Sequence, residues 1–291
     1  MNSCISAIQH LRPLRGGAQS HLLRATDGNW YVTKFQNNPQ HIRVLTNEML
    51  ATKVGLALGL PMPHVAVIEV SDWLIEHTAE LGIQLGGPTI PCRSGKQFGS
   101  HCVGPPDRTL DYMPSESLGG IRNVADFARV LVLDKWTCNA DGRQAVFWHR
   151  TPRSRRYDAT FIDQGYCFNA GEWTFPDYAL RGVFANNCVY EGVTGWDAFE
   201  PALTGAEEMD SDAIWGAQPT FRKSGTKEIE TDCTGWWTNS TVADASFGGS
   251  SVCFVNRRGT RFQIGAIRGR GLLREWRTQA FFMSGKPHLQ A

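Results

Sequence analysis

The chain has 291 residues, a formal net charge of +1, 42% hydrophobic residues and 11% aromatic residues. Its length allows one large domain or two lobes with a sizeable core. The balanced charge argues against nucleic acid or a membrane surface as the principal partner. No apolar run reaches the roughly 20 residues that span a bilayer, and Met1 to Ile8 show no leader peptide. No Cys-x-x-Cys pair occurs, which favours reduced thiols. We therefore expect a cytoplasmic protein that binds neither membrane nor nucleic acid directly.

The N-terminal residues predict a strand, a glycine-containing turn and a β-hairpin. Residues 6–14 form the expected strand, and the turn that follows contains Gly16 and Gly17. Residues 22–35 predict the hairpin, with its turn at Asp27-Gly28. Glycines between two strands let backbone N–H groups approach phosphate oxygens without interference from Cβ atoms. An ordinary glycine-rich turn also explains such a pair, and no Walker-type motif occurs.

Lys34 lies at the end of this hairpin, in an otherwise apolar and aromatic strand. Two readings of this lysine are open: a solvated edge residue, or a charge held inward to meet a phosphate. Residues 39–60 show helical periodicity that ends at Pro61, and Glu48 falls well inside this helix. In kinases a helix glutamate pairs with a strand lysine and holds it on the α- and β-phosphates. The spacing therefore favours the inward reading.

The middle of the chain predicts further strands, a hinge and a core helix. Residues 64–70 and 82–85 read as strands. Gly86-Gly87-Pro88 and residues 94–106 are rich in Gly, Ser and Pro, and we predict that they form a hinge between two lobes. Residues 123–138 carry apolar side chains around nearly the whole circumference, so we expect a helix buried on all sides.

This helix leads into a polar turn that carries Asp141, and two β-like runs follow. The second run, residues 159–162, ends on Asp163. Kinase-fold phosphotransferases use the order helix, acidic turn, hairpin, acidic turn to place a catalytic Asp and a magnesium-binding Asp beside the ATP γ-phosphate. We expect the two carboxylates to converge on one cleft that opens toward the glycine turn and Lys34. Two acidic residues that merely cap unrelated turns would point to solvent in different directions.

The order and spacing of these motifs resemble those of a HipA-like kinase, in particular the short bacterial members that carry the core kinase region alone. The motifs are Gly16-Gly17, Lys34, Glu48, Asn139-Ala-Asp141 and Ile162-Asp163-Gln-Gly165. The resemblance covers roughly residues 5–215. It implies an α+β, two-lobed protein-kinase-like fold, with a β-rich N-lobe that contains one main helix and a mainly helical C-lobe. It also implies ATP as co-substrate, Mg²⁺ as cofactor, and a protein Ser/Thr acceptor, with a small-molecule hydroxyl as the alternative acceptor.

The resemblance assigns roles to residues of the expected site. Asp141 matches the catalytic Asp, which accepts or orients the proton of the attacking hydroxyl. Asp163 matches the magnesium-binding Asp of the family. Lys34 and Glu48 match the pair that holds the phosphates, beneath the turn of Gly16 and Gly17.

One position departs from the family pattern. The family has an Asn five residues after the catalytic Asp as a second metal ligand, and this chain has Val146 there. Gln144 either supplies an oxygen to the metal from the same turn or is a spectator. If Gln144 is a spectator, a pseudokinase or nucleotide-sensing module without phosphoryl transfer becomes the alternative function.

The expected domain organisation is an N-lobe at residues 1–87, a C-lobe at residues 88–215 and an atypical tail at residues 216–291. Residues 220–251 are rich in Gly, Thr and Ser and show no sustained periodicity. We hypothesise that this tail is the frameshifted translation of a helical ending and is poorly ordered.

Overall fold

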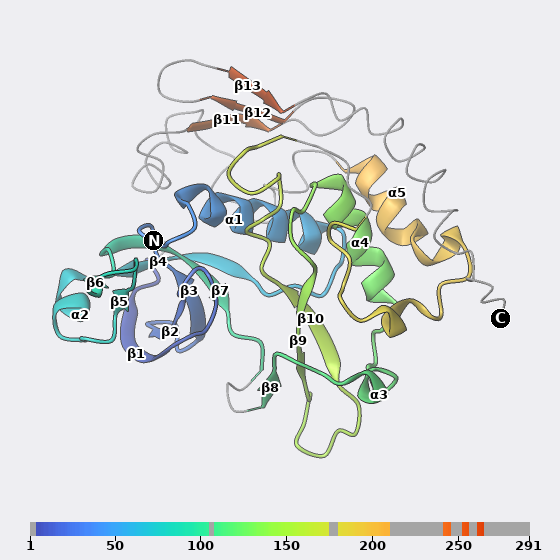
Figure 1. Ribbon diagram of the computed structural model, residues 1–291, viewed down its shortest axis with the longest axis horizontal. Helices are drawn as coiled ribbons and strands as arrows, with labels where there is room; N and C mark the ends of the chain where they lie inside the picture. The colour runs from blue at the N-terminus through green and yellow to red at the C-terminus, as the bar shows by residue number, and fades with distance from the viewer. Residues whose placement is uncertain are drawn as a thin grey trace.

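The computed structural model describes residues 4–104, 108–174 and 180–209, and the backbone of three later strands. A β-rich N-terminal part is followed by a C-terminal part in which helices surround a hairpin (Figure 1). The predicted two-lobed, protein-kinase-like α+β fold is confirmed. The N-terminal elements are β1 (Ala7–Pro13), β2 (His21–Ala25), β3 (Trp30–Lys34), α1 (Ile42–Ala57), β4 (Val65–Val70), α2 (Asp72–Glu76), β5 (Gly82–Ile83), β6 (Ile90–Pro91) and β7 (Gly95–His101). The C-terminal elements are β8 (Thr109–Leu110), α3 (Ser115–Leu118), α4 (Asp126–Trp136), β9 (Gln144–Trp148), β10 (Asp158–Ile162), η1 (Asn187–Tyr190), η2 (Trp196–Ala198) and α5 (Glu200–Glu208).

The N-terminal sheet has five antiparallel strands in the order β1-β2-β3-β7-β4. Its two edges approach each other, because the Glu69 N–H donates to the Ile5 carbonyl at 2.8 Å and Ser6 forms a bridge to Glu69. Both edges therefore find backbone partners at this point, as in a partly closed barrel. Inside lies a core of Leu23, Tyr31, Phe35, Ile68, Val70, Leu81 and Ile83.

The predicted lobe boundary after residue 87 and the predicted hinge at residues 94–106 come too early in the chain, because most of these residues belong to the N-terminal sheet. Residues 95–101 form β7, which lies between β3 and β4 in the N-terminal sheet. Glycine and serine hide this strand from pattern analysis, yet Gly99 is required there. A Cβ atom at position 99 would lie 2.4 Å from Ile68 Cγ1, so only glycine permits the close packing. The chain leaves the sheet after His101, so the connection between lobes begins there.

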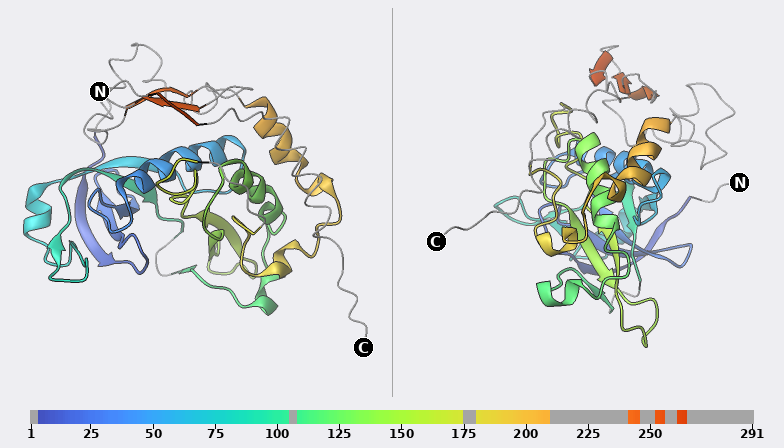
Figure 2. Two further views of the ribbon diagram at one scale, coloured as in Figure 1. Left: turned by 45° about the horizontal axis from the view of Figure 1, so that its top comes forward. Right: turned by 90° about the vertical axis from the view of Figure 1, so that its right-hand side faces the viewer.

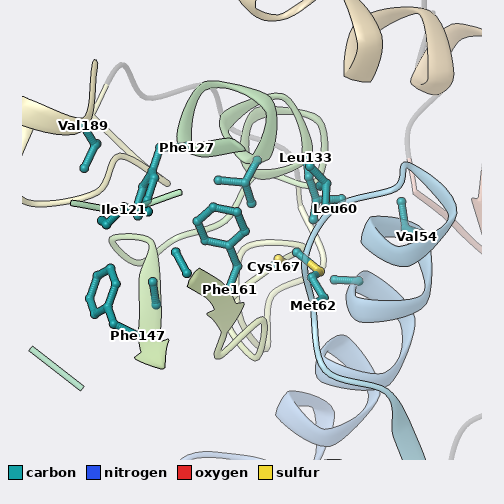
Figure 3. Close-up of a cluster of buried hydrophobic side chains, with 14 of the residues drawn as sticks. Val54, Leu60, Met62, Ile121, Phe127, Leu133, Phe147, Phe161, Cys167 and Val189 are labelled. Atoms are coloured by element: carbon teal, nitrogen blue, oxygen red, sulfur yellow. The ribbon is translucent and has the colours of Figure 1, made fainter. Parts of the chain in front are cut away.

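Helix α1 lies between the two parts and is buried on more than one side. Its apolar residues Leu50, Ala51 and Val54 join the larger core, and Figure 3 shows Val54 at the edge of this cluster. This core continues through Met62, Phe127, Leu133, Phe147, Phe161 and Cys167. Helix α1 also buries polar residues, and these must find hydrogen-bond partners in the protein because water does not reach them.

The C-terminal part is built on α4 and the β9–β10 hairpin. Helix α5 packs on α4 through Ala202, Leu203 and Val132, as the two views in Figure 2 show for the helices. Within the described residues, no helix is long and apolar enough to span a bilayer. Strands β11 (Thr241–Ala245), β12 (Val252–Val255) and β13 (Arg261–Ile264) form a separate antiparallel sheet. The hypotheses on the origin and order of the tail otherwise concern residues outside the described part.

His21 in β2 should make the stability of the N-terminal part depend on pH. His21 is 1% exposed, and its ring places Nδ1 3.2 Å from His10 Nε2 and Nε2 3.6 Å from Cys92 Sγ. Burial, followed by the charge of His10, lowers the pKa of His21 to about 4. Because the unfolded chain binds this proton more tightly, stability is intact above the ordinary histidine pKa. It should fall by about 1.4 kcal/mol per pH unit as the pH drops toward 4.

Urea unfolding followed by tryptophan fluorescence at pH 7.5 and pH 5 measures this slope. The His21→Gln protein should lose much of the pH dependence, whereas His77→Gln, which removes an exposed histidine on α2's C-terminal side, should retain it. Equal slopes in wild type and His21→Gln would contradict the assignment.

Candidate active site

Three charged side chains from distant parts of the chain meet between the two lobes. The Lys34 ammonium donates to a Glu48 carboxylate oxygen and also lies 2.9 Å from Asp163 Oδ1. Lys34 and Glu48 are 7% and 3% exposed, so neither is a solvated edge residue. The predicted pairing of Lys34 with Glu48 is confirmed. The sequence prediction placed Asp163 in a cleft facing Lys34, and the structure shows a direct ion pair between them.

Burial and the charges within this cluster act together on the pKa values of all three groups. Burial by itself lowers the pKa of Lys34, but the Glu48 and Asp163 carboxylates outweigh it and raise that pKa. Burial, together with the nearby Asp163 charge, raises the pKa of Glu48 to about 7. Burial would also raise the pKa of Asp163, but Lys34, Glu48 and Arg143 hold it below its ordinary value. Asp163 therefore stays ionised beside a fixed cation.

The backbone of Asp163 has a left-handed conformation. Its φ is +60°, a left-handed value that Asp tolerates better than most residues. Gly165 follows, and a Cβ atom there would lie 2.5 Å from Val44 Cγ1 of α1. The small residue thus allows the chain after Asp163 to pass directly against α1, next to Glu48.

Buried polar residues of α1 hold the segment that follows Asp163, residues 164–174. The Gln164 N–H donates to Glu48 Oε2 at 3.1 Å, and Thr52 Oγ1 donates to Gln164 Oε1 at 3.3 Å. Asn47 Nδ2 donates to the carbonyls of Gly165 and Ala170 at 2.8 and 2.7 Å. These contacts explain why α1 buries polar side chains, and they fix the position of Asp163 relative to Glu48.

This segment contains a turn of left-handed backbone at Phe168, Asn169 and Ala170, with φ between 55° and 58°. Each such non-glycine residue costs roughly 1–2 kcal/mol. Hydrogen bonds offset the cost: the Phe168 N–H donates to the Thr137 carbonyl at 2.6 Å, and the Asn169 N–H donates to the Cys138 carbonyl at 3.1 Å. The strained turn is therefore held by the end of α4 and by α1.

Asp141 is exposed, and its turn (residues 137–143) is tied to the rest of the site through the backbone. The Asp141 N–H donates to Asn139 Oδ1 at 3.1 Å, and the Ala140 N–H donates to the Tyr166 carbonyl at 2.9 Å. The Gly182 N–H donates to the Asp141 carbonyl at 2.9 Å. The carboxylate itself accepts only short-range bonds, from the Gly142 N–H at 2.7 Å and from Gln144 Nε2 at 3.4 Å.

Beneath the turn lies a fully buried ion pair between Asp134 and Arg143, both with 0% exposed side chains. Arg143 Nε donates to Asp134 Oδ2 at 2.8 Å, and Arg143 NH1 donates to the Ile162 carbonyl at 2.9 Å. Asn139 Nδ2 donates to Asp134 Oδ1 at 2.9 Å. Since Ile162 directly precedes Asp163, one guanidinium joins the end of α4 to the residue next to Asp163. This pair positions the Asp141 turn against the Asp163 backbone.

The β9–β10 register places the two aspartates at one end of the hairpin. Gln144 pairs with Ile162, so Asp163 follows directly opposite Arg143, and Asp141 lies two residues before Arg143. Gln144 and Val146 share the outer face of β9, because the alternate residues Ala145 and Phe147 are buried in the core. Gln144 thus stands on the face where the family pattern expects a second ligand.

The turn of Gly16 and Gly17 lies near the segment that follows Asp163. Gly16 has φ +132°, which a residue with a side chain rarely adopts. A Cβ atom at Gly17 would lie 2.9 Å from Gln40 Nε2, which in turn donates to the Tyr166 hydroxyl at 3.2 Å. The Gln19 side chain holds the turn from the other side through two hydrogen bonds with the Gln84 backbone, at 2.7 and 2.8 Å.

Sequence reasoning missed the residues that position this site. Asp134 and Arg143 hold the Asp141 turn, while Asn47 and Thr52 hold the segment after Asp163. One signal was available: an acidic residue in the middle of the apolar pattern of α4 must be paired if the helix is buried. The polar residues of α1 gave no comparable signal, because helix surfaces commonly carry them.

Comparison with known proteins finds a family match over part of the chain. A family model described as HipA-like kinase matches residues 8–149, which include Lys34, Glu48 and Asp141 and end before Asp163. No curated protein matches the chain. Among solved structures, the chain is similar to the Helicobacter pylori proinflammatory kinase CtkA, with 14% identity and a TM-score of 0.41. That match covers 57% of this chain and 62% of CtkA, less than two thirds of its length. Residues 8–149 of the chain are thus similar to the HipA-like kinase family.

Proposed function

We propose that this protein is a phosphotransferase that moves the γ-phosphoryl group of ATP to a hydroxyl, with a protein Ser or Thr as the acceptor. The observation that carries the proposal is the buried Lys34 ammonium, held between Glu48 and Asp163. A buried cation fixed at the junction of two lobes suits the stabilisation of phosphate oxygens, since it needs no reorganisation when charge develops.

Mg²⁺ is the cofactor that we propose for this site. The oxygens available are those of the Asp163 carboxylate and of the Gln144 amide on the adjoining face of β9. Hard oxygen donors of this kind suit Mg²⁺, which also retains waters and binds substrate phosphates. Among the described residues, no group of three or more His, Cys, Asp and Glu side chains forms a metal site. The proposed ion therefore depends on the nucleotide for part of its ligands, and it would neutralise charge on the β- and γ-phosphates.

The residues of the chain have separate tasks in this proposal. Lys34 binds the phosphate oxygens, and Glu48 keeps the ammonium in place. Asp141 accepts a hydrogen bond from the acceptor hydroxyl and orients it toward the phosphorus, for which its exposed carboxylate is accessible. Asn139 and Arg143 hold the backbone on either side of Asp141.

A nucleotide-binding module without phosphoryl transfer is the second candidate. One observation favours it: Val146 occupies the position of the expected second metal ligand on the outer face of β9. A phosphoryl-transfer assay distinguishes the two functions, because a nucleotide-binding module binds ATP without transferring its labelled phosphate to itself or to any acceptor.

The Lys34→Met variant tests the proposal. The full chain is incubated with γ-labelled ATP and Mg²⁺, alone and with a degenerate Ser/Thr peptide library, and products are identified by mass spectrometry. Wild type should transfer label, and Lys34→Met should transfer it about a hundredfold more slowly, because no fixed cation remains. The control Lys96→Met, on the neighbouring strand β7, should transfer label normally. ATP binding without label transfer by wild type would favour the binding module, and equal rates in all three proteins would refute the role of Lys34.

A further inference from the structure

The loop that joins β9 and β10 is a second feature with a chemical character of its own. In Figures 1 and 2 it projects beyond the helices of the C-terminal part. Residues 150–156, here called the basic tip, have the sequence Arg-Thr-Pro-Arg-Ser-Arg-Arg. All four arginines are exposed, and Arg122 lies beside them.

The basic tip has a defined conformation. Arg150 donates twice to Asp158 at 2.9 Å, and Ser154 Oγ donates to the Arg156 carbonyl at 2.9 Å. Arg122 NH2 lies 3.3 Å from Ser154 Oγ, and Arg156 NH2 donates to the Ile121 carbonyl at 3.3 Å. The loop backbone is thus fixed before any partner binds, which reduces the entropy lost on binding.

The positive charge of this region is not neutralised locally. Asp158 is the acid that pairs with Arg122 and Arg150. Arg153 and Arg155 form no ion pair with any residue that the structure describes. The five arginines and Asp158 sum to +5 − 1 = +4, so the rest of this +1 chain carries 1 − 4 = −3. The basic tip and Arg122 therefore carry an excess of positive charge that Asp158 offsets only in part.

We propose that the basic tip is a docking surface for an acidic segment of a partner protein. Guanidinium groups bind carboxylates through paired N–H donors, and Arg153 and Arg155 offer theirs to solvent. A nucleic acid fits less well, because its duplex needs a basic stripe over a wide face and a strongly basic domain, whereas this chain has a pI near 7.6. The proposal goes beyond phosphoryl transfer and does not depend on it.

The hairpin geometry adds a spacing rule if the docked protein is also the acceptor. Asp158 and Trp148 close the tip end of the hairpin, and Asp163 follows at the other end. The five residues of β10 span roughly 15 Å at about 3.3 Å per residue. An extended acceptor that reached both ends would need at least about five residues between its acidic segment and its hydroxyl.

Fluorescence anisotropy with the full chain tests the proposal. The probes are fluorescein-labelled peptides of ten glutamates and of ten lysines, and a labelled DNA duplex of 20 base pairs. The variant Arg153→Gln/Arg155→Gln removes two side chains that no described contact requires. The control Arg12→Gln/Arg93→Gln removes the same charge from exposed positions of the N-terminal part.

The glutamate peptide should bind wild type, and the Arg153→Gln/Arg155→Gln variant should bind it about tenfold more weakly, with less than a twofold change in the control. The interaction should weaken with salt, as contacts between exposed charges do. Equal losses in variant and control would overturn the proposal, since general charge would then explain binding. Tighter binding of the duplex than of the glutamate peptide would also overturn it, as would failure of wild type to bind the peptide. A catalytically inactive chain that still binds through the tip would leave the proposal standing.

Discussion

The Asp141→Asn protein should transfer phosphate at least about a hundredfold more slowly than wild type while it still binds ATP. An asparagine keeps the size of the side chain, and its Oδ1 can still accept a hydrogen bond from the Gly142 N–H. It cannot accept a proton, and it does not attract the acceptor hydroxyl as a carboxylate does. Because Asp141 is exposed and makes only short-range contacts, the fold should be unaffected. Label transfer and nucleotide affinity, measured on the same preparation, separate the two effects.

The exposed carboxylate of Asp111 provides a matched control. The Asp111→Asn protein should transfer label at the wild-type rate. An Asp141→Asn protein that retained full activity would exclude this residue as the proposed base. An equal loss of nucleotide affinity would instead assign Asp141 to binding.

The Arg143→Met protein should be destabilised by about 3–5 kcal/mol, because it leaves the Asp134 carboxylate buried without its partner. The Ile162 carbonyl and the backbone next to Asp163 would lose a donor as well. Urea unfolding followed by tryptophan fluorescence measures the loss as a lower midpoint with an unchanged slope.

Arg129 supplies the control, since it pairs with Asp126 on the same α4 helix but its side chain is 41% exposed. The Arg129→Met protein should lose no more than about 1 kcal/mol. The double variant Asp134→Leu/Arg143→Met should recover part of the Arg143→Met loss, because no unpaired charge remains buried. Similar losses of unfolding free energy in Arg143→Met and Arg129→Met would show that the buried pair contributes no more to stability than the exposed pair.

Parts of the site could be predicted because local patterns carry them. The strand that ends on Lys34, the helix around Glu48 and the hairpin that ends on Asp163 each have a periodicity or turn that a short stretch reveals. Because the strand that carries Lys34 and the helix that carries Glu48 follow each other in the chain, the resemblance to the kinase fold was enough to predict that the two side chains pair.

Other parts depend on contacts between residues far apart in the chain. Strand β7 lacks β-branched residues, and its glycine at position 99 is explained by contacts with Ile68 and Tyr31 of the neighbouring strands. The salt bridge from Lys34 to Asp163 and the hydrogen bonds of Asn47 join segments more than a hundred residues apart. Such pairs leave no trace in local periodicity, so only the folded chain reveals them.

The attachment of α1 to residues 164–174 has a thermodynamic consequence. The Glu48 side chain pairs with Lys34 and accepts a hydrogen bond from the Gln164 N–H, so α1 contacts both the proposed phosphate-binding lysine and the loop after Asp163. With nucleotide bound at Lys34 as proposed, a ligand that displaces this loop is expected to change the affinity for nucleotide, and nucleotide to change the affinity for that ligand by the same factor. The strained turn at Phe168 to Ala170 lowers the free energy needed to displace the loop, since its release recovers the cost of three left-handed residues. In the proposed function, α1 would therefore couple binding of the acceptor to binding of the nucleotide.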